Sequence, residues 1–243
     1  QCPFGAMTDK GQIVDVIRKL MEGKKLVALY APAIAAQFRA VPGQLEAALK
    51  QAGFYKAFEV AHGADITADK EAAEFEERMD GGDVLMTSSC CPAYVRSVKI
   101  HAPDLIPFVS ETRSPMHYTA VLAKEENPDY VTVFIGPCLA KRKEGLDDPY
   151  VDYVLSAEEI GAIFMAKQID IGSCEALECS EQPTATGRNF AQSGGVAEAV
   201  RIRLKNPEGL RPAIINGLDL AGMKQLKAYG KAAAEGKPCD ANL

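Results

Sequence analysis

Residues 130–135 read Tyr-Val-Thr-Val-Phe-Ile, and residues 25–30 read Lys-Leu-Val-Ala-Leu-Tyr. Both are short apolar runs, the first rich in β-branched residues, and both predict strands that are buried on two faces. Further short strands are predicted at residues 54–61, 84–86, 151–155 and 212–215. Helical patterns separate these strands, and this alternation indicates an α/β fold with mostly parallel sheets.

The predicted helices have recognisable starts. Ser156 is placed to cap a helix that runs to about residue 166, Pro92 occupies the first position of a helix to residue 101, and Asp9 is placed to cap a helix to about residue 22. The other predicted helices span residues 42–52, 65–79, 115–126, 194–204 and 220–229.

The predicted strands form two groups that are separated near residues 115–128. This grouping predicts two α/β lobes with a ligand-binding cleft between them, each a mostly parallel twisted sheet flanked by helices. We expect the first lobe at residues 9–118 and the second at residues 119–243.

The composition argues against several classes of protein. The 243 residues are 47% apolar and 25% charged, which is incompatible with a disordered chain. The net charge of −6 argues against a nucleic-acid-binding surface. No apolar run approaches the roughly 18 residues of a membrane span. Since no signal peptide begins the chain, we expect a cytoplasmic protein, and the lack of an initial methionine indicates a piece of a longer one.

The sequence contains seven cysteines, an odd number, and two of them are adjacent. This usage favours metal or redox chemistry over a secreted disulfide framework. Cys90 and Cys91 follow one predicted strand, and Cys138 follows another. Ligands of parallel sheets lie beyond the carboxyl ends of strands, so this placement suits an iron–sulfur site. The alternative is that Cys90 or Cys91 is simply a small buried hydrophobic residue.

Two motifs resemble the active-site signatures of the [FeFe]-hydrogenases. Residues 88–94, Ser-Ser-Cys-Cys-Pro-Ala-Tyr, resemble the first signature, T-S-C-C-P followed by an aromatic residue. Residues 137–144, Pro-Cys-Leu-Ala-Lys-Arg-Lys-Glu, match the second, P-C-x-x-K-x-x-E, at every fixed position. Supporting stretches occur in the family's order at residues 31–34, 114–115, 187–190 and 193–196. The chain is therefore identified as a member of this family's catalytic H-cluster domain.

The resemblance implies roles for individual residues. Cys91 and Cys138 correspond to two of the four thiolate ligands of the [4Fe–4S] half of the H-cluster. Lys141 corresponds to the lysine that hydrogen-bonds a cyanide ligand of the diiron subsite. Cys90 corresponds to the non-ligating thiol that exchanges protons with that subsite. The other catalytic positions are Glu74, Ser110 and Glu144, and those lining the cofactor pocket are Pro32, Ala33, Pro115, Met116 and Phe190.

Simpler interpretations of these residues stay open from the sequence alone. Helical periodicity does not single out Glu74, because Glu71 lies nearer to the apolar stripe, and either residue is by pattern a solvated glutamate. Lys141 lies in a Lys-Arg-Lys run that is typical of an exposed basic turn, and Ser110 could cap a turn. The three histidines lack metal-ligand spacing.

Four positions depart from the family pattern. Gly136 stands where catalytic relatives usually carry methionine, Tyr94 where many carry tryptophan, Met116 where many carry glutamine, and Ala33 where the standard enzymes carry serine. These departures resemble less-studied branches of the family, some of which are thought to sense hydrogen or to turn over slowly.

The family's third signature, E-x-M-x-C-x-x-G-C, does not occur in the 243 residues. It supplies the last two ligands of the [4Fe–4S] cube, and we expect it beyond Leu243. The 243-residue chain by itself is therefore expected to be apo, or nearly so, and inactive. Residues 1–8, with Cys2-Pro3, resemble the tail end of an upstream ferredoxin-like segment.

The resemblance implies a ferredoxin-type hydrogenase that catalyses 2H⁺ + 2e⁻ ⇌ H₂ at an H-cluster held in the cleft between the lobes. Ferredoxin, or an upstream ferredoxin-like domain, would supply electrons, and hydrogenase maturation proteins would install the cofactor. No nucleic-acid or membrane partner is expected. One alternative is a hydrogen-sensing or iron–sulfur-binding relative with little or no turnover, and another is a dithiol redox protein that uses Cys90 and Cys91.

Overall fold

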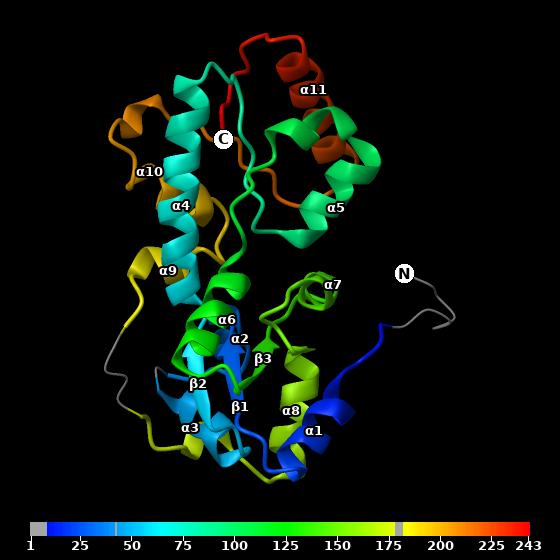
Figure 1. Ribbon diagram of the computed structural model, residues 1–243, viewed down its shortest axis with the longest axis vertical. Coiled ribbons are helices and arrows are strands. Elements are labelled where there is room, and N and C mark those ends of the chain that lie inside the picture. Colours follow the sequence, from blue (N-terminus) through cyan, green and yellow to red (C-terminus); the bar gives the residue numbers. More distant parts are fainter. Residues whose placement is uncertain (1–8, 42, 178–181) are drawn as a thin grey trace. The chain divides into compact units, whose positions relative to one another are not determined.

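The computed structural model describes residues 9–41, 43–177 and 182–243, and the predicted ferredoxin-like tail at residues 1–8 lies outside this part (Figure 1). The chain forms two compact units, each made of two separate segments. Unit 1 comprises Gln1–Val60 and Thr119–Gln182, and unit 2 comprises Ala61–Tyr118 and Pro183–Leu243.

Unit 1 is built on a four-stranded parallel sheet, which confirms the predicted α/β class. Its strands are β1 (Leu26–Tyr30), β2 (Lys56–Glu59), β3 (Val131–Ile135) and β4 (Tyr153–Leu155), in the order β2-β1-β3-β4. The chain runs from β1 to β2 on one side and then places β3 on the other side of β1. The carboxyl ends of β1 and β3 therefore flank the point where the strand order reverses, which is the usual ligand site of such sheets.

Helices and sheet in unit 1 share one apolar core. The described helices of this unit are α1 (Ile13–Met21), α2 (Pro32–Gln37), α3 (Gln44–Gln51), α7 (Ala140–Asp147) and α8 (Ala157–Ala166), the C-terminal part of α6 (Pro115–Glu126) and the 3₁₀ turn η2 (Ile171–Ser173). Leu26 and Ala28 of β1 and Ile135 of β3 pack with Val16 of α1 and Ile160 of α8, all fully buried. Alternate strand residues point to the same face, so this core covers one side of the sheet.

Of two N-caps predicted from the sequence, one is confirmed and one was wrong. Ser156 begins α8 as predicted: its side chain accepts a hydrogen bond from the backbone N–H of Glu159, whose carboxylate in turn accepts from the N–H of Ser156. The prediction that Asp9 caps the first helix was wrong. Helix α1 begins at Ile13, and the carboxylate of Asp9 instead lies 2.7 Å from the guanidinium of Arg142.

Truncation of the fully buried Ile135 tests the core of unit 1. Ile135→Ala removes methyl groups from the centre of the sheet and is expected to lower the free energy of unfolding by about 2–5 kcal/mol. Met165→Ala is the control, because Met165 on α8 is 82% exposed and its truncation should change that free energy by less than about 0.5 kcal/mol. Urea denaturation measures both, and equal effects of the two substitutions would contradict the assigned core.

Unit 2 is mainly helical. Its described elements are α4 (Ala61–Asp80), α5 (Pro92–His101), η1 (Pro103–Phe108), the N-terminal part of α6, α9 (Ala185–Asn189), α10 (Gly195–Arg201), η3 (Pro207–Gly209) and α11 (Leu220–Ala234). One apolar face of α4 is buried: its Ala72 and Phe75 pack against Met86, Val200 and Leu204.

The expectation of a second sheet was wrong for the described residues. Within the two segments of unit 2, residues 61–118 and 183–243, the β pairing is limited to one isolated parallel bridge. It joins Thr87 and Val109, both in the first segment. The segments predicted as strands at residues 84–86 and 212–215 still form backbone hydrogen bonds with the last residues of the chain. The N–H of Met86 donates to the carbonyl of Asn242 (3.0 Å), and the N–H of Ala213 donates to the carbonyl of Leu243 (2.6 Å). These pairings are too short to form a ladder.

The compact units differ from the predicted lobes at residues 9–118 and 119–243. A parallel pair requires a crossover connection, and the crossover from β2 to β3 here contains residues 61–118, the whole first segment of unit 2. Grouping strands by their order in the sequence could not show that β3 pairs with β1. Among the described residues, no helix combines the length and the hydropathy that crossing a membrane requires.

Candidate functional site

The loops after β1 and β3 lie at the same edge of the sheet in unit 1. Tyr30 at the end of β1 is paired with Ile135 at the end of β3, and the N–H of Ala31 donates to the carbonyl of Ile135 at 2.9 Å. Pro32 then starts α2, and Cys138 stands two residues before α7. The predicted site residues Pro32, Ala33 and Cys138 therefore all flank the reversal point of the sheet.

The side chains that follow Cys138 are ordered by ion pairs. Cys138 is exposed, while Lys141 Nζ lies 2.7 Å from Glu144 Oε2, with the two side chains only 13% and 21% exposed. Arg142 donates to the carbonyl of Val154 (3.0 Å) and to Glu159 Oε2 (2.8 Å). The Lys-Arg-Lys run is thus not a solvated basic turn, because two of its three cations are largely buried and paired.

Gly136, one of the departures from the family pattern, lies against an aromatic ring. A Cβ atom at this position would stand 2.5 Å from a ring carbon of Phe134, which is itself buried in β3. Any larger residue at position 136 therefore requires that ring to move. The ring of Phe134 occupies the space that a side chain at position 136 would use.

In unit 2, Cys90 and Cys91 form the loop that leads into α5. Cys91 is the N-cap residue with an extended backbone, and Pro92 occupies the first helical position as predicted. Cys91 is exposed, whereas Cys90 is half-buried and accepts a hydrogen bond from the hydroxyl of Ser88 at 3.4 Å.

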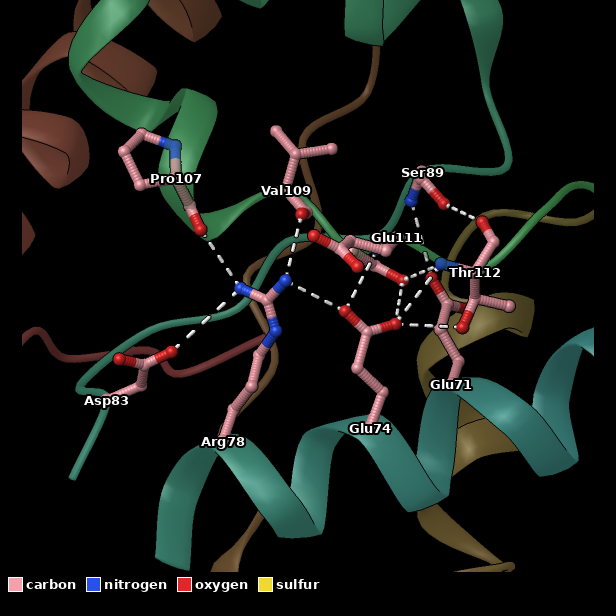
Figure 2. A network of polar contacts seen from close by, with 10 residues as sticks. Glu71, Glu74, Arg78, Asp83, Ser89, Pro107, Val109, Glu111 and Thr112 are labelled. Carbon is pink, nitrogen blue, oxygen red and sulfur yellow. Dashed lines mark hydrogen bonds and ion pairs between the residues drawn. The ribbon is translucent and has the colours of Figure 1, made fainter. Parts of the chain in front are cut away.

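Two glutamates lie one turn apart on α4, and Figure 2 shows Glu71 beside Ser89 of this loop and Glu74 beside Glu111 and Thr112. Glu71 is fully buried, and its Oε1 accepts a hydrogen bond from the N–H of Ser89 at 3.3 Å. Its Oε2 has no hydrogen-bonding partner within the described chain. Burial raises the pKa of Glu71 to about 7, although the neighbouring Ser88 hydroxyl and the N–H of Ser89 act in the opposite direction. Glu71 can therefore gain or lose a proton near neutral pH.

Glu74 lies in a richer set of donors than Glu71. Its Oε2 accepts from Ser110 Oγ (2.6 Å) and from Thr112 Oγ1 (2.8 Å), and its Oε1 accepts from the N–H of Glu111 (2.9 Å). The guanidinium of Arg78 lies 2.9 Å from the same carboxylate (Figure 2). Glu74 is thus not a solvated glutamate. Ser110, another of the predicted catalytic residues, donates a hydrogen bond to it.

The surroundings of the two glutamates shift their pKa values in opposite directions. Partial burial acts to raise the pKa of Glu74, but the hydrogen bonds from Ser110, Glu111 and Thr112 and the charge of Arg78 outweigh it and lower that pKa. At neutral pH Glu74 is therefore ionised while Glu71 is partly protonated. Two neighbouring carboxyl groups with pKa values driven apart are typical of sites that handle protons.

A pocket of about 540 Å³ lies within unit 2 beside the cysteine loop. Its lining includes Thr87, Ser88, Cys90, Cys91 and Tyr94, from the cysteine loop and the residues beside it. Its other walls are mainly apolar and come from α10, α11, Leu85, Leu243 and residues 213–218. Cofactor sites are typically concave and apolar with a few polar groups at one end, and this pocket has that character.

The remaining predicted positions lie in unit 2 outside the lining of this pocket. Pro115 starts α6, Met116 is fully buried behind it, and Phe190 follows the end of α9. The two predicted metal ligands are in different units, Cys91 in unit 2 and Cys138 in unit 1. Within residues 9–41, 43–177 and 182–243, no group of three or more potential ligands is assembled from histidine, cysteine, aspartate and glutamate.

Glu71 was not selected from the sequence, although a signal was present. It stands in the buried register of α4, three residues after Ala68 and four before Phe75, both of which are buried. A glutamate in an apolar stripe is expected to be buried with its charge suppressed. The buried hydroxyls of Thr87 and Tyr94 carried no comparable signal.

Comparison with known proteins gives one family over most of the chain. The family model described as "Iron only hydrogenase large subunit, C-terminal domain" matches residues 24–238. Iron hydrogenase 1 of Clostridium pasteurianum is 28% identical over 228 residues, which cover 81% of this chain and 39% of that enzyme. The solved structure of a variant of [FeFe]-hydrogenase HydA1 from Chlamydomonas reinhardtii is similar to this chain with a TM-score of 0.69 and 25% sequence identity. The match covers 86% of this chain and 61% of the HydA1 chain.

The relatives include proteins of another kind. A probable cytosolic Fe–S cluster assembly factor from Nematostella vectensis is 29% identical over 227 residues, which cover 76% of this chain and 51% of that protein. The chain thus spans about two fifths of the Clostridium hydrogenase and about half of the assembly factor.

Proposed function

Because the chain belongs to the iron-only hydrogenase large-subunit family, whose C-terminal domain model matches residues 24–238, we propose that it serves in the reversible reaction 2H⁺ + 2e⁻ ⇌ H₂. The family's cofactor is the H-cluster, a [4Fe–4S] cluster joined to a diiron subsite. When bound, this group supplies the redox chemistry, and the protein supplies ligands, protons and a shielded pocket.

One observation supports catalysis above all. The buried glutamate Glu71, whose pKa is raised to about 7, lies beside the Ser88–Cys90 loop, and the hydroxyl of Ser88 donates to Cys90 Sγ. A carboxyl group that exchanges a proton near neutral pH beside this thiol suits an enzyme that delivers protons to a buried centre. Burial of such a group is costly, so its presence favours a role in proton transfer.

The residues present fit part of the ligand set of an iron–sulfur cluster. Cys91 is an exposed thiol at a helix N-terminus beside the unit 2 pocket, and Cys138 is an exposed thiol at the sheet edge of unit 1. A [4Fe–4S] cluster takes four thiolates, so these two cysteines would supply half of them. We therefore propose that the 243 residues by themselves do not hold a complete cluster.

The chain's own residues then divide the work of moving protons. Cys90 Sγ is proposed to exchange protons with the reacting centre, and Glu71 is proposed to exchange them with Cys90. Ser110 Oγ and Glu74 Oε2, 2.6 Å apart, would continue the path, with Arg78 holding Glu74 ionised and in place. At the sheet edge, Lys141 would present a cation to an anionic ligand while Glu144 orients its ammonium group.

A second candidate function is a relative that binds a cluster with little or no turnover. The similarity to an Fe–S cluster assembly factor favours it, as does Gly136, where the resemblance to catalytic relatives implies methionine. Hydrogen production by the full-length protein, purified anaerobically after co-expression with hydrogenase maturation proteins, decides between the two. Hydrogen evolution from reduced methyl viologen supports catalysis, and a bound cluster without hydrogen evolution contradicts it.

The partners proposed for catalysis are a ferredoxin-type electron donor and the proteins that install the H-cluster. A cytoplasmic location is proposed with them, in line with the cytosolic relative.

Replacement of either predicted ligand tests the cofactor assignment. In the full-length protein, Cys91→Ser and Cys138→Ser are each expected to lower the iron bound per protein molecule severalfold, because a hydroxyl is a poor substitute for a thiolate ligand. Cys174→Ser is the matched control, since this buried thiol contacts Gln51 and the carbonyl of Asp170 and should leave iron binding unchanged. Iron counting together with EPR makes the measurement, and full iron content in either ligand variant would refute the assignment.

A further inference from the structure

Arg142 joins α7 to three other parts of unit 1. Its guanidinium donates to the carbonyl of Val154 in β4 at 3.0 Å and to Glu159 Oε2 in α8 at 2.8 Å. Its Nε lies 2.7 Å from the carboxylate of Asp9, in the segment before α1. The side chains of Arg142 and Glu159 are only 11% and 13% exposed. One largely buried cation thus connects α7, β4, α8 and the segment before α1.

Glu159 extends these contacts to the chain that enters unit 1. Its Oε1 accepts a hydrogen bond from the N–H of Gln12 at 3.2 Å, and Gln12 Oε1 accepts from the N–H of Val154 at 2.8 Å. A Cβ atom at Gly11 would lie 2.5 Å from Glu159 Oε1, so the glycine leaves room for this carboxylate. The contacts of Arg142 therefore belong to a network that closes on itself.

The turn before α7 links Arg142 to the predicted ligand Cys138. The N–H of Lys141 donates to the carbonyl of Cys138 at 3.1 Å, and the N–H of Arg142 donates to the carbonyl of Leu139 at 3.1 Å. These two overlapping backbone hydrogen bonds make residues 138–142 one turn. A displacement of Arg142 therefore moves the cysteine and the lysine with it.

Two faces of α7 make different contacts. Gly145 lies one turn after Arg142, and a Cβ atom there would stand 2.6 Å from a methyl carbon of Val154, so this face packs closely on β4. Lys141 and Glu144, also one turn apart, lie on the neighbouring face and pair with each other at 2.7 Å. Rotation of α7 about its axis would therefore displace the ammonium group of Lys141.

We propose that Arg142 is a positioning residue: by fixing α7 it holds the ammonium of Lys141, and the turn that begins at Cys138, in place for the proposed reaction. The inference rests on the proposed function, in which Lys141 presents a cation to an anionic ligand that the resemblance identifies as cyanide. Arg142 acts through these residues, because its own side chain is bound to β4, α8 and Asp9. A misplacement of about 1 Å can lower a rate by about a hundredfold.

Removal of both charges of the Arg142–Glu159 pair tests the proposal in the full-length, matured protein. Arg142→Gln alone leaves Glu159 as a largely buried carboxylate without its cation, which destabilises folding. The double variant Arg142→Gln/Glu159→Gln avoids this stranded charge. Glutamine also serves at the N3 position of the capping box that begins α8, so the helix start is kept.

Three measurements follow the double variant. Amide hydrogen exchange of residues 138–142, measured by mass spectrometry, should become at least about tenfold faster. The infrared band of the cyanide ligand should shift in the direction in which Lys141→Gln shifts it, since both changes take the cation away from the ligand. Hydrogen turnover per bound iron should decrease by about tenfold. A general loss of stability lowers the folded fraction but leaves the infrared band of the folded molecules in place.

Lys143→Gln is the matched control from the same basic run. Its ion pair with Asp147 is exposed, 59% and 61%, so its loss should change none of the three measurements. An unshifted cyanide band or unchanged amide exchange in the double variant overturns the inference, whatever the turnover, while the proposed function stands. Wild-type protein that carries the cofactor without evolving hydrogen contradicts the proposed function, and the exchange and infrared results then still decide the inference. Full-length protein that takes up no diiron group overturns both.

Discussion

Replacement of Cys90 by serine in the full-length, matured protein is expected to lower hydrogen turnover by at least about a hundredfold while leaving the iron content unchanged. An ordinary thiol, with a pKa of about 8.5, exchanges protons near neutral pH far better than a serine hydroxyl does. Cys90 is half-buried and accepts a hydrogen bond from Ser88, so serine fits the same space. Hydrogen evolution at neutral pH and iron counting on the same preparation measure the two quantities.

Cys239→Ser serves as the control for Cys90→Ser. Cys239 lies beyond the end of α11, outside the lining of the unit 2 pocket, and its replacement should alter neither turnover nor iron content. Turnover that is preserved in Cys90→Ser would remove this thiol from the proton path. Joint loss of iron and turnover would instead mean that Cys90 is a ligand.

The second large effect is expected from Glu71, in the pH dependence of folding stability. The pKa of this buried carboxyl group is raised from 4.5 to about 7 in the folded state, a difference equivalent to about 3 kcal/mol. Between these pH values the folded state binds a proton that the unfolded state has released, so stability decreases as pH rises. The contribution is complete below about pH 4.5 and is lost by about pH 7.

Glu71→Gln should remove this slope, because the amide does not titrate. Denaturant unfolding from pH 4.5 to 8 should therefore show wild-type stability falling relative to the variant by about 3 kcal/mol. Glu77→Gln, an exposed change on the same helix, should leave the slope in place. Parallel curves for wild type and Glu71→Gln would mean that Glu71 is ionised throughout this range and cannot relay protons.

Local patterns predicted the parts of the fold that depend on local physics. The buried strands at residues 25–30 and 130–135 were recognisable because a strand covered on both faces needs an unbroken apolar run. The start of α8 was recognisable because Ser156 and Glu159 satisfy each other's backbone groups within one turn. The position of Cys90 and Cys91 directly before α5 was predicted correctly, because Pro92 marks the start of that helix.

Features that depend on distant partners were not predictable in this way. Arg142 stands in a charged run, and only the fold brings Asp9 and Glu159 to it. The division into units escaped prediction because the pairing of β3 with β1 spans residues 61–118. The surroundings of Glu74 likewise come from residues 110–112, more than thirty positions away.

The ring of Phe134 over Gly136 has a consequence for the history and engineering of this protein. The two positions are coupled: a side chain at 136 is excluded while the ring stays in place, since its first carbon would lie 2.5 Å from that ring. Returning position 136 to the methionine implied by resemblance to catalytic relatives is therefore not a single step. Residue 134 has to shrink or turn first, and that change by itself leaves a hole in the buried sheet. Each order of the two changes is therefore expected to pass through a destabilised intermediate, so positions 134 and 136 have to be changed together.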